Sequence, residues 1–92
     1  MILKLTDSFS LSEDAVARTV GEEIMLLDLA SGTYFGLDGV GGRFWQLLEE
    51  GLSGVEARDT MLDEFEVAVE QIDADLNDLV AQLADKGLIT PN

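Results

Sequence analysis

The sequence predicts an α+β fold in which a three-stranded antiparallel sheet is followed by three helices. Over the first third of the chain, apolar residues come in short runs separated by glycine-containing turns, as they do in strands. From Val40 onward they recur every three or four positions, which is the spacing of amphipathic helices. The 92 residues are enough for one domain, residues 1–92, that buries roughly 60 to 65 per cent of its unfolded surface.

Three strands are expected, over residues 15–20, 24–29 and 33–37. The first is short and partly alternating, and the turn Gly21-Glu22 follows it. The second is a nearly continuous apolar run, which is typical of a strand covered on both faces. Ser31-Gly32 then gives a two-residue hairpin signal before the third strand. The three segments are therefore expected to form an antiparallel meander.

Three helices are expected in the rest of the chain. The first opens near residues 39–42 and ends at Gly51. The second begins at residues 53–56 with a Ser-x-x-Glu capping box, in which each side chain satisfies a backbone N–H of the other residue. The third spans roughly residues 68–86, and Ala68 gives it a weak N-terminal cap. The positions expected to be buried are Val40, Phe44, Leu47 and Leu48 in the first helix, Val55, Met61, Leu62 and Phe65 in the second, and Val69, Ile72, Leu76, Leu79 and Leu83 in the third.

The end of the third helix has its own sequence signature. Lys86 suits the negative end of the helix dipole, and Gly87 suits the left-handed position that follows a helix. Leu88 is then expected to fold back on Leu83, and Pro91 to stop the chain.

The composition excludes several classes of function. The 19 acidic and 5 basic residues give a net charge of −14, which opposes the counterion release that drives nucleic-acid binding. The chain has no cysteine and no histidine, so disulfides, thiolate zinc sites and histidine-based catalysis are excluded. Adjacent carboxylates such as Glu49-Glu50 do not face one another on a helix, so no catalytic pair stands out. We therefore expect no enzyme activity, no cofactor, no metal and no nucleic-acid partner.

The sequence also bears on location. The N-terminal apolar run is too short for a signal peptide, and no segment approaches the roughly 18 consecutive apolar residues of a membrane span. A cytoplasmic protein with no membrane partner is expected.

Three motifs resemble known sites, but each lacks a required part. Glycines in residues 39–42 follow a strand and open a helix, as in phosphate-binding loops, yet the third glycine of a dinucleotide fingerprint would fall at Phe44. The acidic run 73–78 resembles half of a calcium loop, with Asp78 where the turn glycine is required. Asp7-Ser8-Phe9 resembles the attachment site of acyl carrier proteins, but strand-like sequence follows it. Turn geometry and a solvated helix face are the preferred interpretations.

Two aromatic pairs, Tyr34-Phe35 and Phe44-Trp45, are more informative. Successive strand residues face opposite ways, and helix neighbours are about 100° apart, so one member of each pair is expected to point inward. The other member is left for a groove.

An ordered set of residues across positions 12–89 resembles the coenzyme PQQ synthesis protein D family. It comprises Leu29, Gly32, Tyr34-Phe35, Leu37-Asp38, Val40-Gly41, Phe44-Trp45, Leu47-Leu48, Glu64-Phe65, Val67, Asp75-Leu76, Leu83 and Gly87-Leu88-Ile89.

The resemblance implies a winged-helix-like fold and a binding module, not a catalyst. Members of the family are recognition elements for the leaders of ribosomally made, modified peptides, and the leader adds as a strand beside the third strand of the sheet and rests on the third helix. The resemblance favours the lasso-peptide type, which hands its precursor to a leader peptidase. Two alternatives stay open: a PQQ-pathway chaperone that serves a radical SAM enzyme, and a winged-helix regulator. An open strand edge could also pair two copies into a homodimer.

Carried onto this chain, the implied peptide site lies on the third strand and on one face of the third helix. Tyr34 or Phe35 is expected to line an apolar pocket, with Asp75 as a polar partner at its rim. The overall acidity suggests basic residues in the leader or in the enzyme, with salt-sensitive association. The implied site residues are Thr33, Tyr34, Phe35, Gly36, Leu37, Ile72, Asp75, Leu76 and Leu79.

Overall fold

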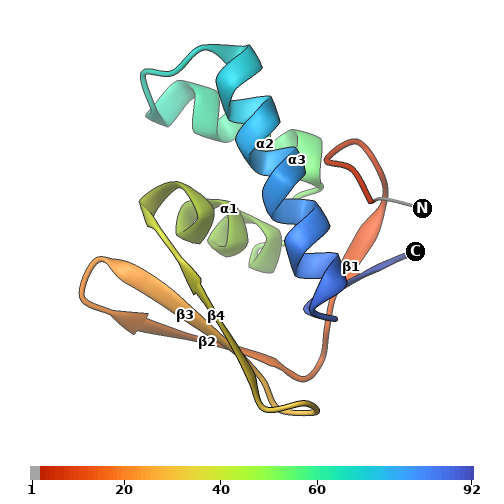
Figure 1. Ribbon diagram of the computed structural model, residues 1–92. Helices are drawn as coiled ribbons and strands as arrows, with labels where there is room; N and C mark the ends of the chain where they lie inside the picture. The colour runs from red at the N-terminus through yellow and green to blue at the C-terminus, as the bar shows by residue number, and fades with distance from the viewer. Residues whose placement is uncertain (1–2) are drawn as a thin grey trace.

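A computed structural model describes residues 3–92, and its main sheet is the predicted antiparallel meander (Figure 1). The strands β2 (Ala15–Val20), β3 (Glu23–Asp28) and β4 (Thr33–Leu37) pair in the order β2-β3-β4. Ile24 is opposite Leu37, and Leu26 is opposite Phe35. Because β3 is the centre strand, β4 forms one edge of this sheet, and within the described chain it pairs with no strand other than β3.

The main sheet buries one face, whereas the sequence had suggested that the strand at 24–29 is covered on both. Ile24 and Leu26 on the inner face are 7% and 0% exposed. On the outer face, Leu27 is half-buried and its neighbour Tyr34 is exposed. The expectation of a doubly covered strand is wrong because the helices cover only the inner face, and the outer-face side chains Val16, Val20 and Tyr34 are exposed.

The hairpin between β3 and β4 has a four-residue loop, Leu29 to Gly32, and not the expected two-residue turn. The buried Asp28 organises it: one carboxylate oxygen accepts the Ala30 N–H at 3.2 Å, and the other accepts the Ser31 hydroxyl at 2.8 Å. The Gly32 N–H donates to the Asp28 carbonyl at 2.7 Å, with Gly32 at φ +74°. Such side-chain bonds let Asp initiate a turn that a dipeptide pattern does not reveal.

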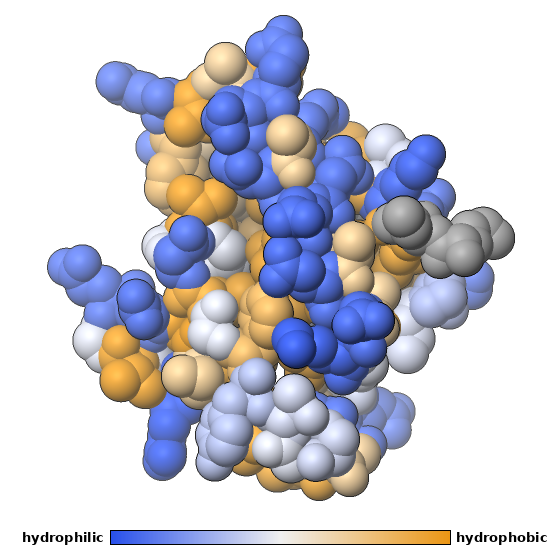
Figure 2. Space-filling model, in the orientation of Figure 1, coloured by the Kyte–Doolittle hydropathy of each residue, from blue (hydrophilic) through white to orange (hydrophobic). Residues whose placement is uncertain are grey.

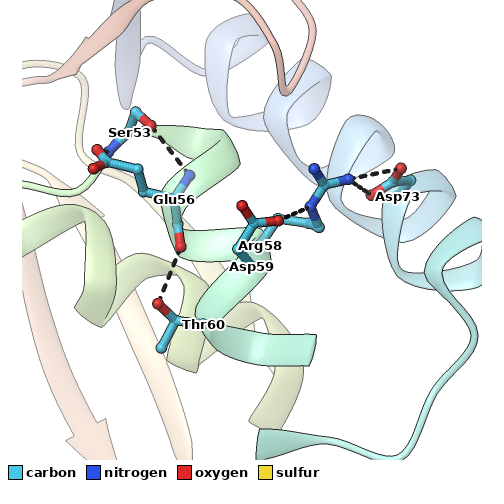
Figure 3. Close-up of polar contacts among 6 residues, drawn as sticks. All are labelled: Ser53, Glu56, Arg58, Asp59, Thr60 and Asp73. Carbon is cyan, nitrogen blue, oxygen red and sulfur yellow. Dashed lines mark hydrogen bonds and ion pairs between the residues drawn. The ribbon is translucent and has the colours of Figure 1, made fainter. Parts of the chain in front are cut away.

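The three helices are confirmed within a residue or two: α1 (Gly39–Glu49), α2 (Gly54–Glu64) and α3 (Val69–Asp85). The predicted capping box is present, since Glu56 N–H donates to the Ser53 hydroxyl at 3.1 Å and Ser53 N–H to the Glu56 carboxylate at 2.9 Å (Figure 3). Asp38 caps α1 by accepting the Gly41 N–H at 2.8 Å, whereas Ala68 gives α3 no side-chain cap.

Burial along the helices follows the predicted stripes with three corrections. Phe44 and Trp45 are both buried, so neither is left for a groove, because α1 is covered by the sheet on one side and by α2 on another. Val69 is 41% exposed because it opens α3 beyond the packed region. The buried Ala57 and Val80 were not predicted.

Two ion pairs tie the helices together. Arg58 on α2 donates to both carboxylate oxygens of Asp73 on α3, at 2.8 and 3.0 Å (Figure 3). These bonds raise the pKa of Arg58. Arg43 on α1 donates to both oxygens of Glu64 at the end of α2, and the same bonds lower the pKa of Glu64.

The predicted helix end is confirmed, and the chain then continues as a strand. Gly87, at φ +74°, donates its N–H to Ala84, and the Leu88 N–H donates to the Leu83 carbonyl at 2.9 Å. The expectation that Pro91 stops the chain is wrong, because β5 (Ile89–Pro91) pairs antiparallel with β1 (Phe9–Leu11). Proline is tolerated there because β5 has a free edge. The N-terminal and C-terminal segments therefore lie side by side (Figure 1).

Residues before β1 also contribute to the core. Leu5 is 2% exposed, and its N–H donates to the Asn77 side-chain oxygen at 2.8 Å. Within residues 3–92, no helix combines the length and the hydropathy that a bilayer crossing requires.

Gly54 makes this N-terminal packing possible, and we predict that Gly54→Ala destabilises the fold. An added Cβ would lie 2.5 Å from the Leu5 carbonyl oxygen and 3.1 Å from its Cδ1, so the backbone would have to move. The free energy of unfolding, measured in urea, should fall by about 1–3 kcal/mol. Gly39→Ala is the matched control, since a Cβ there meets nothing within 4 Å. Equal effects of the two substitutions would contradict this packing.

Candidate functional site

A groove of about 550 Å³ lies between β4 and α3 and is the candidate site. Figure 2 shows hydrophobic surface in this region, bordered by hydrophilic side chains of α3. Its walls come from four elements: the start of β3, the second half of β4, the first turn of α1 and the middle of α3. The lining residues are Glu23, Phe35, Gly36, Leu37, Asp38, Val40, Gly41, Asp75, Leu76, Asp78, Leu79 and Gln82.

The groove has an apolar floor. Phe35 and Leu37 alternate with outward residues of β4, so both side chains point toward the helices. Leu76 and Leu79 meet them from α3. Gly41 allows the close approach, because a Cβ there would lie 3.3 Å from Leu37 Cδ2 and 3.4 Å from Leu79 Cδ2. The floor can therefore receive apolar side chains from an occupant.

The side of the groove is formed by the backbone of β4. In an edge strand, alternate residues turn their N–H and C=O groups away from the sheet, where they can pair with another chain. Gly36 has no side chain, and a Cβ added there would make only an ordinary contact of 3.9 Å with Met25 Cε. An extended segment could thus lie along β4 and reach the apolar floor at the same time.

Four carboxylates stand around the groove: Glu23, Asp38, Asp75 and Asp78. The side chain of Asp75 accepts the Gln71 amide at 3.0 Å, and that of Asp78 accepts the Gln82 amide at 2.9 Å. Over residues 3–92, none of the four forms an ion pair with a basic side chain. The same part of the chain contains no group of three or more acidic residues arranged to hold a metal ion. The carboxylates instead come from three separate places: the start of β3, the junction of β4 and α1, and the middle of α3.

A cation lies beside the groove, over the ring of Phe35. The Lys86 ammonium sits 5.7 Å from the centroid of the Phe35 ring, within the range of a cation–π interaction. Lys86 immediately follows α3, whereas Leu79, about two turns earlier, lies beside Gly41 of α1, so Lys86 lies on the side of the groove away from α1. The groove therefore has an acidic end and a basic end.

The structure brings together six of the nine residues implied by the family resemblance. Tyr34 is 66% exposed on the outer face of the sheet, Ile72 is 2% exposed within the core, and half-buried Thr33 begins β4. None of these three lines the groove, while the six that do are Phe35, Gly36, Leu37, Asp75, Leu76 and Leu79. Of the two aromatic residues in β4, Phe35 faces the groove.

The sequence prediction missed six lining residues. Asp78 and Gln82 could have been found, because each is three residues from a predicted member of the same helix face. Glu23 lies at the groove because of the strand register, and Val40 lies there because of how α1 packs. The periodicity of the sequence predicts neither the register nor this packing. The missed residues are Glu23, Asp38, Val40, Gly41, Asp78 and Gln82.

Comparison with known proteins gives a family and two structural relatives. The family described as coenzyme PQQ synthesis protein D (PqqD) matches residues 23–89. The structure of TbiB1 in complex with the TbiA(beta) leader peptide is 41% identical, with a TM-score of 0.80, over 87% of this chain and 93% of that one. A lasso peptide synthetase B1 complexed with the leader peptide is 26% identical, with a TM-score of 0.78, over 90% of this chain and 98% of that one. No curated protein matched.

Because the carboxylates of the groove lack cationic partners, we predict that neutralising one of them stabilises the free protein. Asp75 and Asp78 are three positions apart on α3, and like charges at this spacing repel. Asp78→Asn should raise the free energy of unfolding by a few tenths of a kcal/mol at low salt, and less at high salt.

Asp73→Asn on the same helix is the control for this prediction. It removes the ion pair with Arg58 and should lower the free energy of unfolding by up to about 1 kcal/mol. Urea denaturation at two salt concentrations measures both variants. Destabilisation by Asp78→Asn would show that this carboxylate has a structural role.

Proposed function

The chain belongs to the coenzyme PQQ synthesis protein D family, and on that premise we propose that it binds the leader of a ribosomally made precursor peptide and presents it to a processing enzyme. The observation that carries this proposal is the open edge of β4 beside an apolar groove. A role in presentation needs a surface that holds an extended chain, and it needs no catalytic group.

Strand addition is the binding mode that this geometry supports. A leader lying along β4 would form main-chain hydrogen bonds with the groups that β4 turns away from β3, which gives affinity that tolerates sequence changes. Its side chains would alternate between the two faces of the extended sheet. One set would enter the groove over Phe35 and Leu79, and the other would lie on the outer face beside Tyr34.

The structural relatives support a lasso-peptide pathway over PQQ assembly. Both are complexed with a leader peptide, and one is described as a lasso peptide synthetase B1. In that pathway the processing enzyme would be a leader peptidase. The acidic groove gives no support to a winged-helix regulator, because Asp75 and Asp78 would face the phosphates of a nucleic acid.

The same edge could join two copies when no leader is present. An unpaired strand is a template for pairing with another copy of itself. Such a homodimer would compete with leader binding, so adding leader should convert dimer to monomer in sedimentation experiments.

We expect the chain to bind leader segments and not the core segments of the same precursors. A panel of fluorescein-labelled leaders that includes the TbiA(beta) leader, with the core segments as controls, can be titrated by fluorescence anisotropy. Failure to bind any leader in the panel would refute the proposed function.

For a leader that binds, Leu79→Ala should weaken affinity by about 1–3 kcal/mol, because Leu79 forms part of the apolar floor. Leu29→Ala is the matched control: it makes the same change at a residue that is 62% exposed in the β3–β4 loop, away from the groove. Equal affinities of the two variants would place the leader elsewhere.

Strand addition also predicts a change in hydrogen exchange. Amides of β4 that point away from β3 should exchange rapidly in the free protein and become protected when a leader binds, because they then donate to the added strand. Amide-resolved exchange over Thr33–Leu37 measures this, with the outer strand β2 as the internal reference. Binding without protection in β4 would indicate a different docking mode, such as a helix lying in the groove.

A further inference from the structure

The charged side chains are distributed unevenly along the groove: carboxylates lie near Leu37, and a lysine lies over Phe35. Two carboxylates lie at the end where β4 meets α1. Asp38 caps α1 there, and Glu23 comes directly before Ile24, which is paired with Leu37 at the end of β4. At the end where β4 begins, Lys86 lies over the ring of Phe35. The strand β4 and the helix α3 run in opposite directions along the groove, so the C-terminal end of α3 lies beside the N-terminal end of β4.

From this asymmetry we propose that the groove selects a peptide with basic side chains at its Leu37 end and none at its Phe35 end. The inference rests on the proposed function and adds the class of leader: an extended segment of alternating apolar residues flanked on one side by lysine or arginine. The charges would fix the direction and the register in which the leader lies on β4.

The state of the acidic side chains supports a cationic occupant. Asp75 and Asp78 each have one oxygen held by a glutamine amide, and neither amide neutralises the charge. Of the three arginines, Arg43 pairs with Glu64 and Arg58 pairs with Asp73. Arg18 lies on β2, which contributes no residue to the lining of the groove. The carboxylates are therefore oriented and uncompensated, and a basic side chain entering the groove would find partners in place.

A metal ion is a poorer occupant than a basic peptide. Within residues 3–92, no three acidic side chains converge on a point where an ion could sit. They are distributed over the start of β3, the junction of β4 and α1, and about one turn of α3, which is a span suited to a chain that carries separated charges.

The basic end excludes the opposite orientation. A lysine or arginine placed over Phe35 would meet the Lys86 ammonium and compete with it for the face of the ring. An apolar or acidic side chain would meet no such repulsion. Backbone pairing with β4 alone would specify the direction and register of a bound peptide only weakly. The charges would supply the discrimination between orientations that the strand edge lacks.

A display selection tests this inference without knowledge of the natural leader. Random displayed peptides are selected on the immobilised full chain, on Asp75→Asn/Asp78→Asn, and on the control Glu49→Gln/Asp63→Asn, whose two exposed carboxylates lie outside the groove. The probe for titration is the peptide most enriched on the unsubstituted chain, together with a copy whose basic residues are moved to its other end.

Peptides enriched on the unsubstituted chain and on the control should carry basic residues at one end of an alternating apolar segment. The probe should bind Asp75→Asn/Asp78→Asn roughly three- to thirtyfold more weakly, and the copy with relocated charges should lose a similar factor. Lys86→Glu should restore binding of that copy. Enrichment without a basic bias, or equal loss in the control variant, would overturn the charge inference and leave strand addition standing. Absence of any enriched peptide would count against the proposed function itself.

Discussion

The close approach of α1 to the sheet is the contact on which the rest of the structure depends. A Cβ at Gly42 would lie 3.2 Å from Ile24 Cδ1, and one at Gly41 would press on Leu37 and Leu79. Two small residues therefore let the helix lie directly on β3 and β4, which buries Leu26 and Phe44 completely. These contacts also give Gly41 and Gly42, at the start of α1, a role in packing.

That packing also decides where the groove is. With α1 close to the sheet, its first turn forms one end of the space between β4 and α3, and Val40 and Gly41 line it. The N-terminal segment pairs with the C-terminal one, through β1 and β5, and so covers a different part of the molecule. Had the N-terminal residues paired with β4 instead, the edge would be closed and the groove would have no free backbone beside it.

Local patterns predicted the order of β2, β3, β4 and the three helices, but not the strands β1 and β5, whose pairing depends on tertiary packing. Hairpin signals and the change of period at Val40 located β2 to β4 and the three helices, since these signals are local. The four-residue hairpin loop depends on the buried side chain of Asp28, and the β1–β5 pair joins residues about eighty positions apart. The groove residues from α3 followed from helical spacing, whereas Glu23 and Val40 required knowledge of register and of how α1 packs.

Peptide recognition by the groove would combine three kinds of interaction, which differ in how strongly they select the sequence of the peptide. In the proposed binding mode, the strand edge would pair with an extended backbone, the apolar floor would receive aliphatic or aromatic side chains, and the charges would discriminate between orientations. A net charge of −14 repels other acidic chains and attracts basic ones over a Debye length of about 8–10 Å. The repulsion between Asp75 and Asp78 is predicted to lower the stability of the free domain, and pairing either carboxylate with an arginine would make it unavailable to a ligand. Stability and recognition thus make opposite demands on Asp75 and Asp78. Within residues 3–92 neither forms an ion pair with an arginine, which leaves both carboxylates available for recognition.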